Sequence, residues 1–84
     1  MSYEVGITEP AKKQLGKLDK LTQDRIVAVL ERISIRPGAY VSKLRGDVSF
    51  KLRVGDYRIL MEIDWTEQRI LVHKVAHRKN VYDF

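Results

Sequence analysis

Three basic side chains are expected to meet on one side of a predicted β-hairpin. Its turn is Gly55-Asp56, a two-residue signal of the Gly-X kind. Such a turn pairs Arg53 with Arg58, and Lys51 lies two residues from Arg53 on the same face of its strand. Because directly opposed arginines repel each other, either their stems splay apart in water or the site binds an anion.

Cationic side chains of this kind can cleave RNA when the 2′-hydroxyl of the substrate is the nucleophile. The protein must hold that hydroxyl in line, remove its proton, neutralise charge on the scissile phosphate and help the 5′ oxygen leave. Arginine forks suit the phosphate. Lys51 is a candidate general base, because the positive charges around it favour its neutral form. The product would be a 2′,3′-cyclic phosphate, and DNA could not be a substrate.

Further candidates follow the last predicted strand, 69–76. Arg78 reaches the same site if that strand pairs beside the second strand of the hairpin. Tyr82, four residues on, is a candidate platform on which a base stacks. His77 is a candidate general acid or base because it adjoins Arg78. His73, inside the strand, is interpreted as a structural histidine.

The positive charge of the chain is concentrated in its second half. The formal net charge is +5, with five basic and two acidic residues in 43–58 and four basic and no acidic residues in 69–82. Such a charge suits a nucleic acid, an anionic membrane surface or an acidic protein as partner. Four further basic residues of these stretches are candidate contacts to RNA or to a ribosome: Lys43, Arg45, Lys74 and Lys79.

The composition excludes several other classes of site. The chain has 84 residues and no cysteine, which excludes disulfides, thiolate zinc sites and cysteine nucleophiles. Glu62 and Asp64 alternate on one strand without an apparent third ligand, so we expect no metal and no cofactor. The longest apolar run, 26–30, is too short to cross a bilayer, and we expect no secretory signal. These features predict a single cytoplasmic domain, 1–84, that does not bind a membrane.

The order of the predicted elements is β-α-α-β-β-β. Alternating polarity predicts strands over 2–7 and 49–54, and further strands are predicted over 57–64 and 69–76, after the turns. This order is typical of an α+β domain in which a helical hairpin covers one face of a mostly antiparallel sheet.

Two amphipathic helices are predicted between the first and second strands. The first has Thr8 as its N-cap candidate. The second is expected to begin at Thr22, with Leu21 and Ile26 forming a hydrophobic staple across the cap, and to end before Pro37-Gly38. Its buried face consists of Ile26, Val29, Leu30 and Ile33.

Three segments of the chain resemble the RelE/ParE superfamily of toxin–antitoxin toxins: 43–46 (KLRG), 50–59 (FKLRVGDYRI) and 77–82 (HRKNVY). The resemblance covers essentially the whole chain, and it is greatest to the RelE branch, whose members cut mRNA in the ribosomal A site. It implies an RNA-cleaving set in which Lys51 is the base, Arg53 and Arg58 stabilise the phosphate and transition state, Arg78 assists the leaving group and Tyr82 stacks on a base.

The resemblance also implies partners, and it has two departures. It implies an acidic, partly disordered antitoxin similar to RelB, and a toxin–antitoxin complex that binds operator DNA. The position matching Arg53 is commonly lysine in RelE members. Because arginine does not readily give up a proton, the base role falls to Lys51. The segment between Arg78 and Tyr82 is shorter than in some relatives.

Two other functions stay open at this point. A ParE-like protein would share the fold and inhibit DNA gyrase by binding it, although ParE relatives generally lack the complete basic set. A non-enzymatic basic module would bind nucleic acid with a steep dependence on salt and would cleave nothing.

Overall fold

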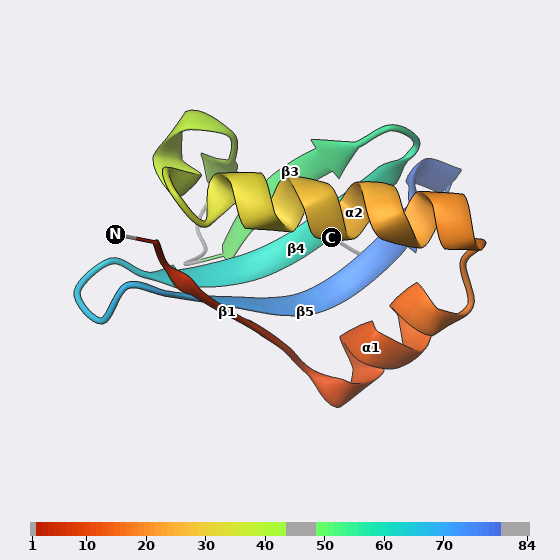
Figure 1. Ribbon diagram of the computed structural model, residues 1–84, viewed down its shortest axis with the longest axis horizontal. Helices are drawn as coiled ribbons and strands as arrows, with labels where there is room; N and C mark the ends of the chain where they lie inside the picture. Colours follow the sequence, from red (N-terminus) through yellow and green to blue (C-terminus); the bar gives the residue numbers. More distant parts are fainter. Residues whose placement is uncertain (1, 44–48, 80–84) are drawn as a thin grey trace.

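Five strands form one mixed sheet with two helices on it (Figure 1). The computed structural model describes residues 2–43 and 49–79, without the side chains of residues 42 and 43. The strands are β1 (Glu4–Ile7), β2 (Ser42–Lys43), β3 (Ser49–Val54), β4 (Tyr57–Asp64) and β5 (Arg69–His77). The helices are α1 (Glu9–Gly16), α2 (Lys20–Ile33) and a short 3₁₀ helix, η1 (Pro37–Ala39).

The spatial order of the strands is β1-β5-β4-β3-β2. β1 runs parallel to β5, and the other neighbours are antiparallel. The predicted α+β class is therefore confirmed. The two-residue strand β2 was not predicted, because so short a segment has no alternation to recognise.

The helix starts follow from their caps. The hydroxyl Oγ1 of Thr8 accepts a hydrogen bond from the N–H of Ala11 (3.4 Å), as expected for an N-cap. The predicted start of α2 at Thr22 is wrong, because Asp19 caps the helix and its carboxylate accepts from the N–H of Thr22 (3.2 Å). Leu21 therefore lies inside the first turn and is 69% exposed, so it forms no staple.

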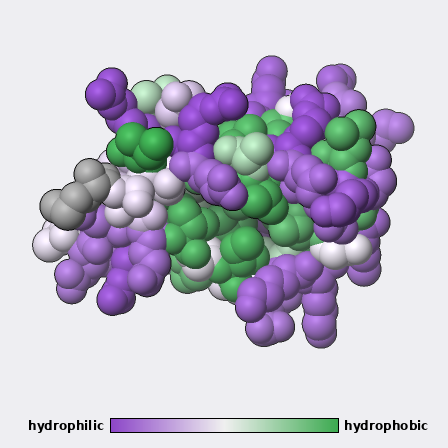
Figure 2. Space-filling model, viewed as in Figure 1, coloured by the Kyte–Doolittle hydropathy of each residue, from purple (hydrophilic) through white to green (hydrophobic). Residues whose placement is uncertain are grey.

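Both helices contribute to a core on one face of the sheet. Fully buried side chains come from α2 (Ile26 and Ile33), from β4 (Ile59 and Met61) and from β5 (Val72). Seen from the helix side, further apolar side chains gather between α2 and α1, over β1 and β5 (Figure 2). Since side chains alternate along a strand, the residues between these buried ones point to the opposite face. No helix of the described part covers that face, where Leu71 is 41% exposed.

The hairpin register agrees with the sequence prediction. Arg53 lies opposite Arg58, and Val54 lies opposite Tyr57 across the Gly55-Asp56 turn. The φ angle of Gly55 is +58°, which a first turn residue of the Gly-X kind requires.

The pairing of β4 with β5 contains a bulge. Leu60 is opposite Lys74 but Met61 is opposite Val72, so His73 is the extra residue. No helix in the described part of the chain has the length and apolar character needed to cross a membrane.

The core assignment predicts unequal effects of two substitutions. Ile59→Ala removes a fully buried side chain of the central strand, and we expect it to lower the free energy of unfolding by about 3 kcal/mol. Leu71→Ala, on the uncovered face, is the matched control and should cost less than about 1 kcal/mol. Urea denaturation measures both, and equal losses would contradict this placement of the core.

Candidate functional site

Arg58 lies at the centre of a group of basic residues on the sheet face away from the helices. Arg53 is directly opposite it on β3, and Lys51 is two residues further along that strand. On the β5 side, Lys74 and Arg78 lie two residues to either side of the partner of Arg58. Directly opposed Cβ atoms are about 5 Å apart and diagonal neighbours about 7–8 Å apart. These five residues are called the basic cluster from here on.

The position of Arg78 depends on the hairpin turn. Its N–H donates to the carbonyl oxygen of Asp56 (2.7 Å), so the pairing of the two strands continues one step beyond β5. Its Nη1 also lies 3.8 Å from Oδ1 of Asp56. Both side chains are about two-thirds exposed, so this ion pair contributes little to stability. Its effect is to hold Arg78 at the same end of the sheet as Arg58.

The cluster can bind a phosphate but has few groups that can transfer a proton. Lys51, Arg53 and Arg78 are exposed, while Arg58 is half-buried and donates to the carbonyl oxygen of Tyr57 (3.3 Å). Guanidinium forks bind phosphate oxygens in pairs, whereas an arginine stays protonated. Proton transfer within this set therefore falls to a lysine. Among the described residues, no three His, Asp or Glu side chains come together in a way that could hold a metal ion.

An apolar residue lies among these cations. Leu60 is half-buried and stands between Lys51 and Lys74 in register across the three strands. A nucleobase or ribose bound over the cluster would meet its side chain. Sequence reasoning missed this residue, although its place opposite Lys51 followed from the same two-residue turn.

His77 does not share the sheet face of Lys51, Arg53 and Arg58, although it lines one hollow together with Lys74. Its ring packs edge-on against Tyr57 (centroids 5.1 Å apart, interplanar angle 83°), which belongs to the core side of the sheet. Its Nδ1 accepts from the N–H of Lys79 (3.2 Å). Although His77 adjoins Arg78 in sequence, its pairing opposite Tyr57 places it on the core face of the sheet. The sequence prediction of a shared site used adjacency along the chain and overlooked this strand pairing.

The remaining predicted contacts are only partly within the described residues. Lys79 is exposed and follows β5, and Lys74 belongs to the cluster. The backbone of Lys43 pairs with Phe50 in β2. Arg45 and Tyr82 lie outside the described residues.

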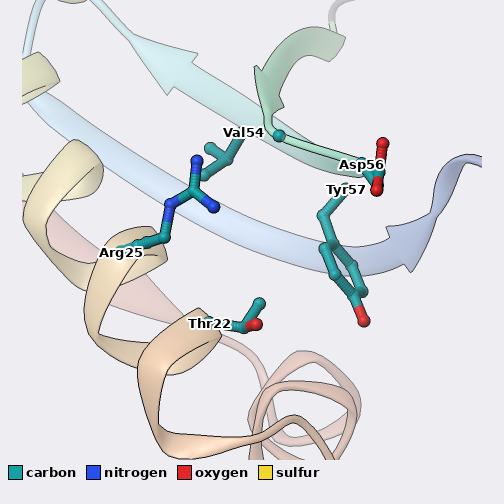
Figure 3. A pocket seen from close by; sticks show the side chains of 6 residues that line it. Thr22, Arg25, Val54, Asp56 and Tyr57 are labelled. Atoms are coloured by element: carbon teal, nitrogen blue, oxygen red, sulfur yellow. The ribbon is translucent and has the colours of Figure 1, made fainter.

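A small hollow lies on the other side of the hairpin turn (Figure 3). Its volume is about 110 Å³, and Arg25 reaches into it from α2 toward the turn, with Thr22 and Tyr57 beside it. A Cβ atom at Gly55 would lie 3.5 Å from Nη2 of Arg25, so the guanidinium packs closely over the turn. The hollow is smaller than a typical ligand pocket of about 300–1,000 Å³. We interpret Arg25 as a support for the turn.

Comparison with solved structures shows close relatives of this fold. The RelBE2 toxin–antitoxin complex from Mycobacterium tuberculosis matches with a TM-score of 0.85 and 28% identity, over 93% of this chain and 100% of that one. The RelE–RelB complex from Pyrococcus horikoshii OT3 matches with a TM-score of 0.82 and 26% identity, over 96% and 100%. The isolated RelE toxin of E. coli matches with a TM-score of 0.75 and 25% identity, over 98% and 93%.

No curated protein matches the chain. A family model does match residues 5–82, and it describes the ParE toxin of type II toxin–antitoxin systems (parDE). The structural neighbours include RelE toxins and their antitoxin complexes, so the predicted superfamily is confirmed. The family model favours the ParE branch and the structures favour the RelE branch, so similarity does not distinguish the two. The chain belongs to the ParE toxin family of type II toxin–antitoxin systems, within the RelE/ParE superfamily.

Proposed function

We propose that this toxin is an endoribonuclease that cuts mRNA in the A site of the ribosome and so inhibits translation. The observation that carries the proposal is that Lys51, Arg53 and Arg58 share one sheet face, which no helix of the described residues covers, and that Arg78 follows β5 at the same end of the sheet. Like charges on neighbouring positions of a sheet destabilise it. A phosphodiester bound among them would offset that repulsion, because it supplies the missing negative charge.

Each residue then has a role in attack by the 2′-hydroxyl. Lys51 removes the proton of the hydroxyl, since it is the cluster member on β3 that can exchange one. Arg53 and Arg58 bind the non-bridging oxygens of the scissile phosphate and stabilise the charge that develops there. Arg78 stabilises the departing 5′ oxygen, and Tyr82 stacks on a neighbouring base. Cleavage leaves a 2′,3′-cyclic phosphate on one product, and the departing 5′ oxygen takes a proton from water to become the 5′-hydroxyl of the other.

The partners in this proposal follow from the charge and from the relatives. Structures of several relatives are complexes of RelE with the antitoxin RelB. A cognate antitoxin rich in acidic residues would neutralise the net charge of +5. The complex of the two would bind operator DNA, and the free toxin would act on cytoplasmic ribosomes, with Lys43, Arg45, Lys74 and Lys79 as further contacts to RNA.

Inhibition of DNA gyrase is the second candidate function, because the family model that matches is that of ParE. The two functions differ in their target, so assays of DNA supercoiling and of translation distinguish them in vitro. A gyrase inhibitor would block DNA supercoiling and leave a translating extract unaffected. A non-enzymatic basic module would do neither and would bind RNA with a steep salt dependence.

The catalytic assignment predicts loss of cleavage without loss of the fold. Lys51→Ala, Arg58→Ala and Arg78→Ala should each reduce cleavage of a translated mRNA by about 100-fold or more, since each removes a group that stabilises the transition state. Lys12→Ala, on the exposed surface of α1, is the matched control and should retain full activity. Primer extension on mRNA from a translating extract measures cleavage, and circular dichroism checks the fold. Full activity of Lys51→Ala and Arg78→Ala would refute the proposal.

The nucleophile predicts a second outcome. An mRNA with a single 2′-deoxynucleotide on the 5′ side of the scissile phosphate should be translated up to that codon but not cut there, because the attacking hydroxyl is absent. The unmodified mRNA, cut at the same codon, is the control. Cleavage of the deoxy substrate at an undiminished rate would require water as the nucleophile and would contradict the mechanism.

The opposed arginines are expected to lower the stability of the fold, because they repel each other while no phosphate is bound. At 20 mM NaCl, Arg53→Gln should raise the free energy of unfolding by about 0.5 kcal/mol, because it removes the repulsion from Arg58. At 500 mM NaCl the gain should vanish, since salt screens exposed charges. Arg36→Gln removes an exposed arginine elsewhere and should show no such gain. Thermal or urea denaturation at both salt concentrations tests this, and a gain that is independent of salt would contradict it.

A further inference from the structure

One carboxylate on the sheet face of the basic cluster has no partner among the described residues. In the part of the chain that the structure describes, the acidic strand residues of this face are Glu4, Glu62 and Asp64. Oε1 of Glu4 lies 3.8 Å from Nε of Arg69, and Asp64 accepts from two backbone N–H groups of the turn that follows it (3.1 and 2.9 Å). Glu62 forms no ion pair with any described residue. Its carboxylate is therefore not used by the fold.

Glu62 is flanked by two leucines. Leu60 precedes it by two positions on β4, and Leu71 lies opposite it on β5. Since side chains at alternate positions of a strand share a face, all three lie on the face away from the helices. Glu62 and Leu71 are exposed and Leu60 is half-buried. A nucleobase that packed on these leucines would exclude water from the carboxylate, which strengthens the hydrogen bonds that the carboxylate accepts.

The distance between Glu62 and the basic cluster suits one nucleotide. Arg58 and Glu62 lie on the same strand, four positions apart, which corresponds to about 13 Å at about 3.3 Å per residue. Leu60 lies halfway between them. An extended nucleotide has a similar length from its phosphate to the hydrogen-bonding edge of its base. A phosphate bound at Arg58 therefore allows the ribose to lie over Leu60 and the base edge to reach Glu62.

The position of Lys51 indicates which nucleotide lies along this path. Lys51 is opposite Leu60, and in the proposed function it removes the proton of the attacking 2′-hydroxyl. That hydroxyl belongs to the nucleotide on the 5′ side of the scissile phosphate. Arg78, which assists the leaving 5′ oxygen, lies beside the hairpin turn, at the other end of the cluster. The ribose over Leu60 is therefore the one on the 5′ side of the cut, and its base extends toward Glu62.

We propose that Glu62 recognises the base on the 5′ side of the cut and that it prefers guanine. The inference rests on the proposed function and adds a base preference to it. An ionised carboxylate only accepts hydrogen bonds, and its two oxygens match two adjacent donors. The Watson–Crick edge of guanine has such a pair, N1–H and N2–H. Adenine and cytosine have one amino group beside an acceptor, and uracil has one N–H between two carbonyl oxygens. Unpaired RNA bases are commonly recognised at this edge.

The test uses four dinucleotides that each contain one phosphate: GpU, ApU, CpU and UpU. A 2′-O-methyl group on the first nucleotide prevents cleavage. Each is titrated into the full chain while NMR follows the backbone amides of Glu62 and Leu71 and the side-chain Nε–H of Arg58. We expect GpU to bind about tenfold more tightly than the other three, and to shift both amides. UpG, which has its guanine on the other side of the phosphate, should bind no more tightly than UpU.

Two variants with the same change in charge separate recognition from electrostatics. Glu62→Gln introduces an amide, which accepts one hydrogen bond and donates another and so matches adenine. ApU should therefore become the tightest ligand of this variant. Glu67→Gln, in the exposed turn after β4, is the matched control and should keep the wild-type order. In a translating extract, Glu62→Gln should also move the mRNA cuts from sites after guanine to sites after adenine, as measured by primer extension.

Three outcomes would overturn the proposal. They are equal affinity for the four dinucleotides, an unchanged order of affinities for Glu62→Gln, and equal binding of UpG and GpU. Any of these, with the signal of Arg58 still shifting, refutes base recognition alone and leaves the proposed function intact. If no dinucleotide shifts the signal of Arg58, the cluster does not bind RNA and both proposals fail. Loss of mRNA cleavage with an intact guanine preference in binding refutes the nuclease alone.

Discussion

The register between β3 and β4 places Arg53 opposite Arg58, and the remaining features of the site are arranged around that repulsion. A two-residue turn with Gly55 at positive φ sets the register, and Arg25 packs over the turn from α2. The same turn contributes Asp56, whose carbonyl oxygen and carboxylate both contact Arg78. A protein selected for stability alone would separate these charges. Keeping them together on a face that no helix of the described residues covers fits a surface that has to bind phosphate.

Much of the fold follows from local patterns. The predicted bounds of β3 and β4 match the structure, and the Gly55-Asp56 turn predicted their register, because a two-residue hairpin leaves no freedom to slip. Local patterns failed to predict the start of α2, where two residues could each act as the N-cap. Asp19 and Thr22 are both good N-caps, and in the structure Asp19 caps α2. The bulge at His73 depends on strand pairing that no short window of sequence contains.

The candidate site was predictable only in part, because some of its residues are brought together by pairing between strands and not by local sequence. Lys51, Arg53 and Arg58 come from one hairpin, so local geometry sufficed to group them. The place of Lys74 in the cluster depends on the pairing of β4 with β5, and the position of His77 on the opposite face depends on its pairing with Tyr57. Such features arise from contacts between segments far apart in the chain, which composition and spacing do not encode.

The central claim is that the basic cluster is the site that binds RNA, and it is tested most directly with a non-cleavable ligand. A trinucleotide RNA with 2′-O-methyl groups can be titrated into the protein while the side-chain Nε–H signals of Arg53, Arg58 and Arg78 are followed by NMR. The account predicts that these three signals shift together and that log Kd changes with log salt concentration with a slope of about 1.4 in magnitude, since the trinucleotide has two phosphates. Shifts confined to Arg25, Arg32 and Arg36 on the helix side, or affinity independent of salt, would contradict it.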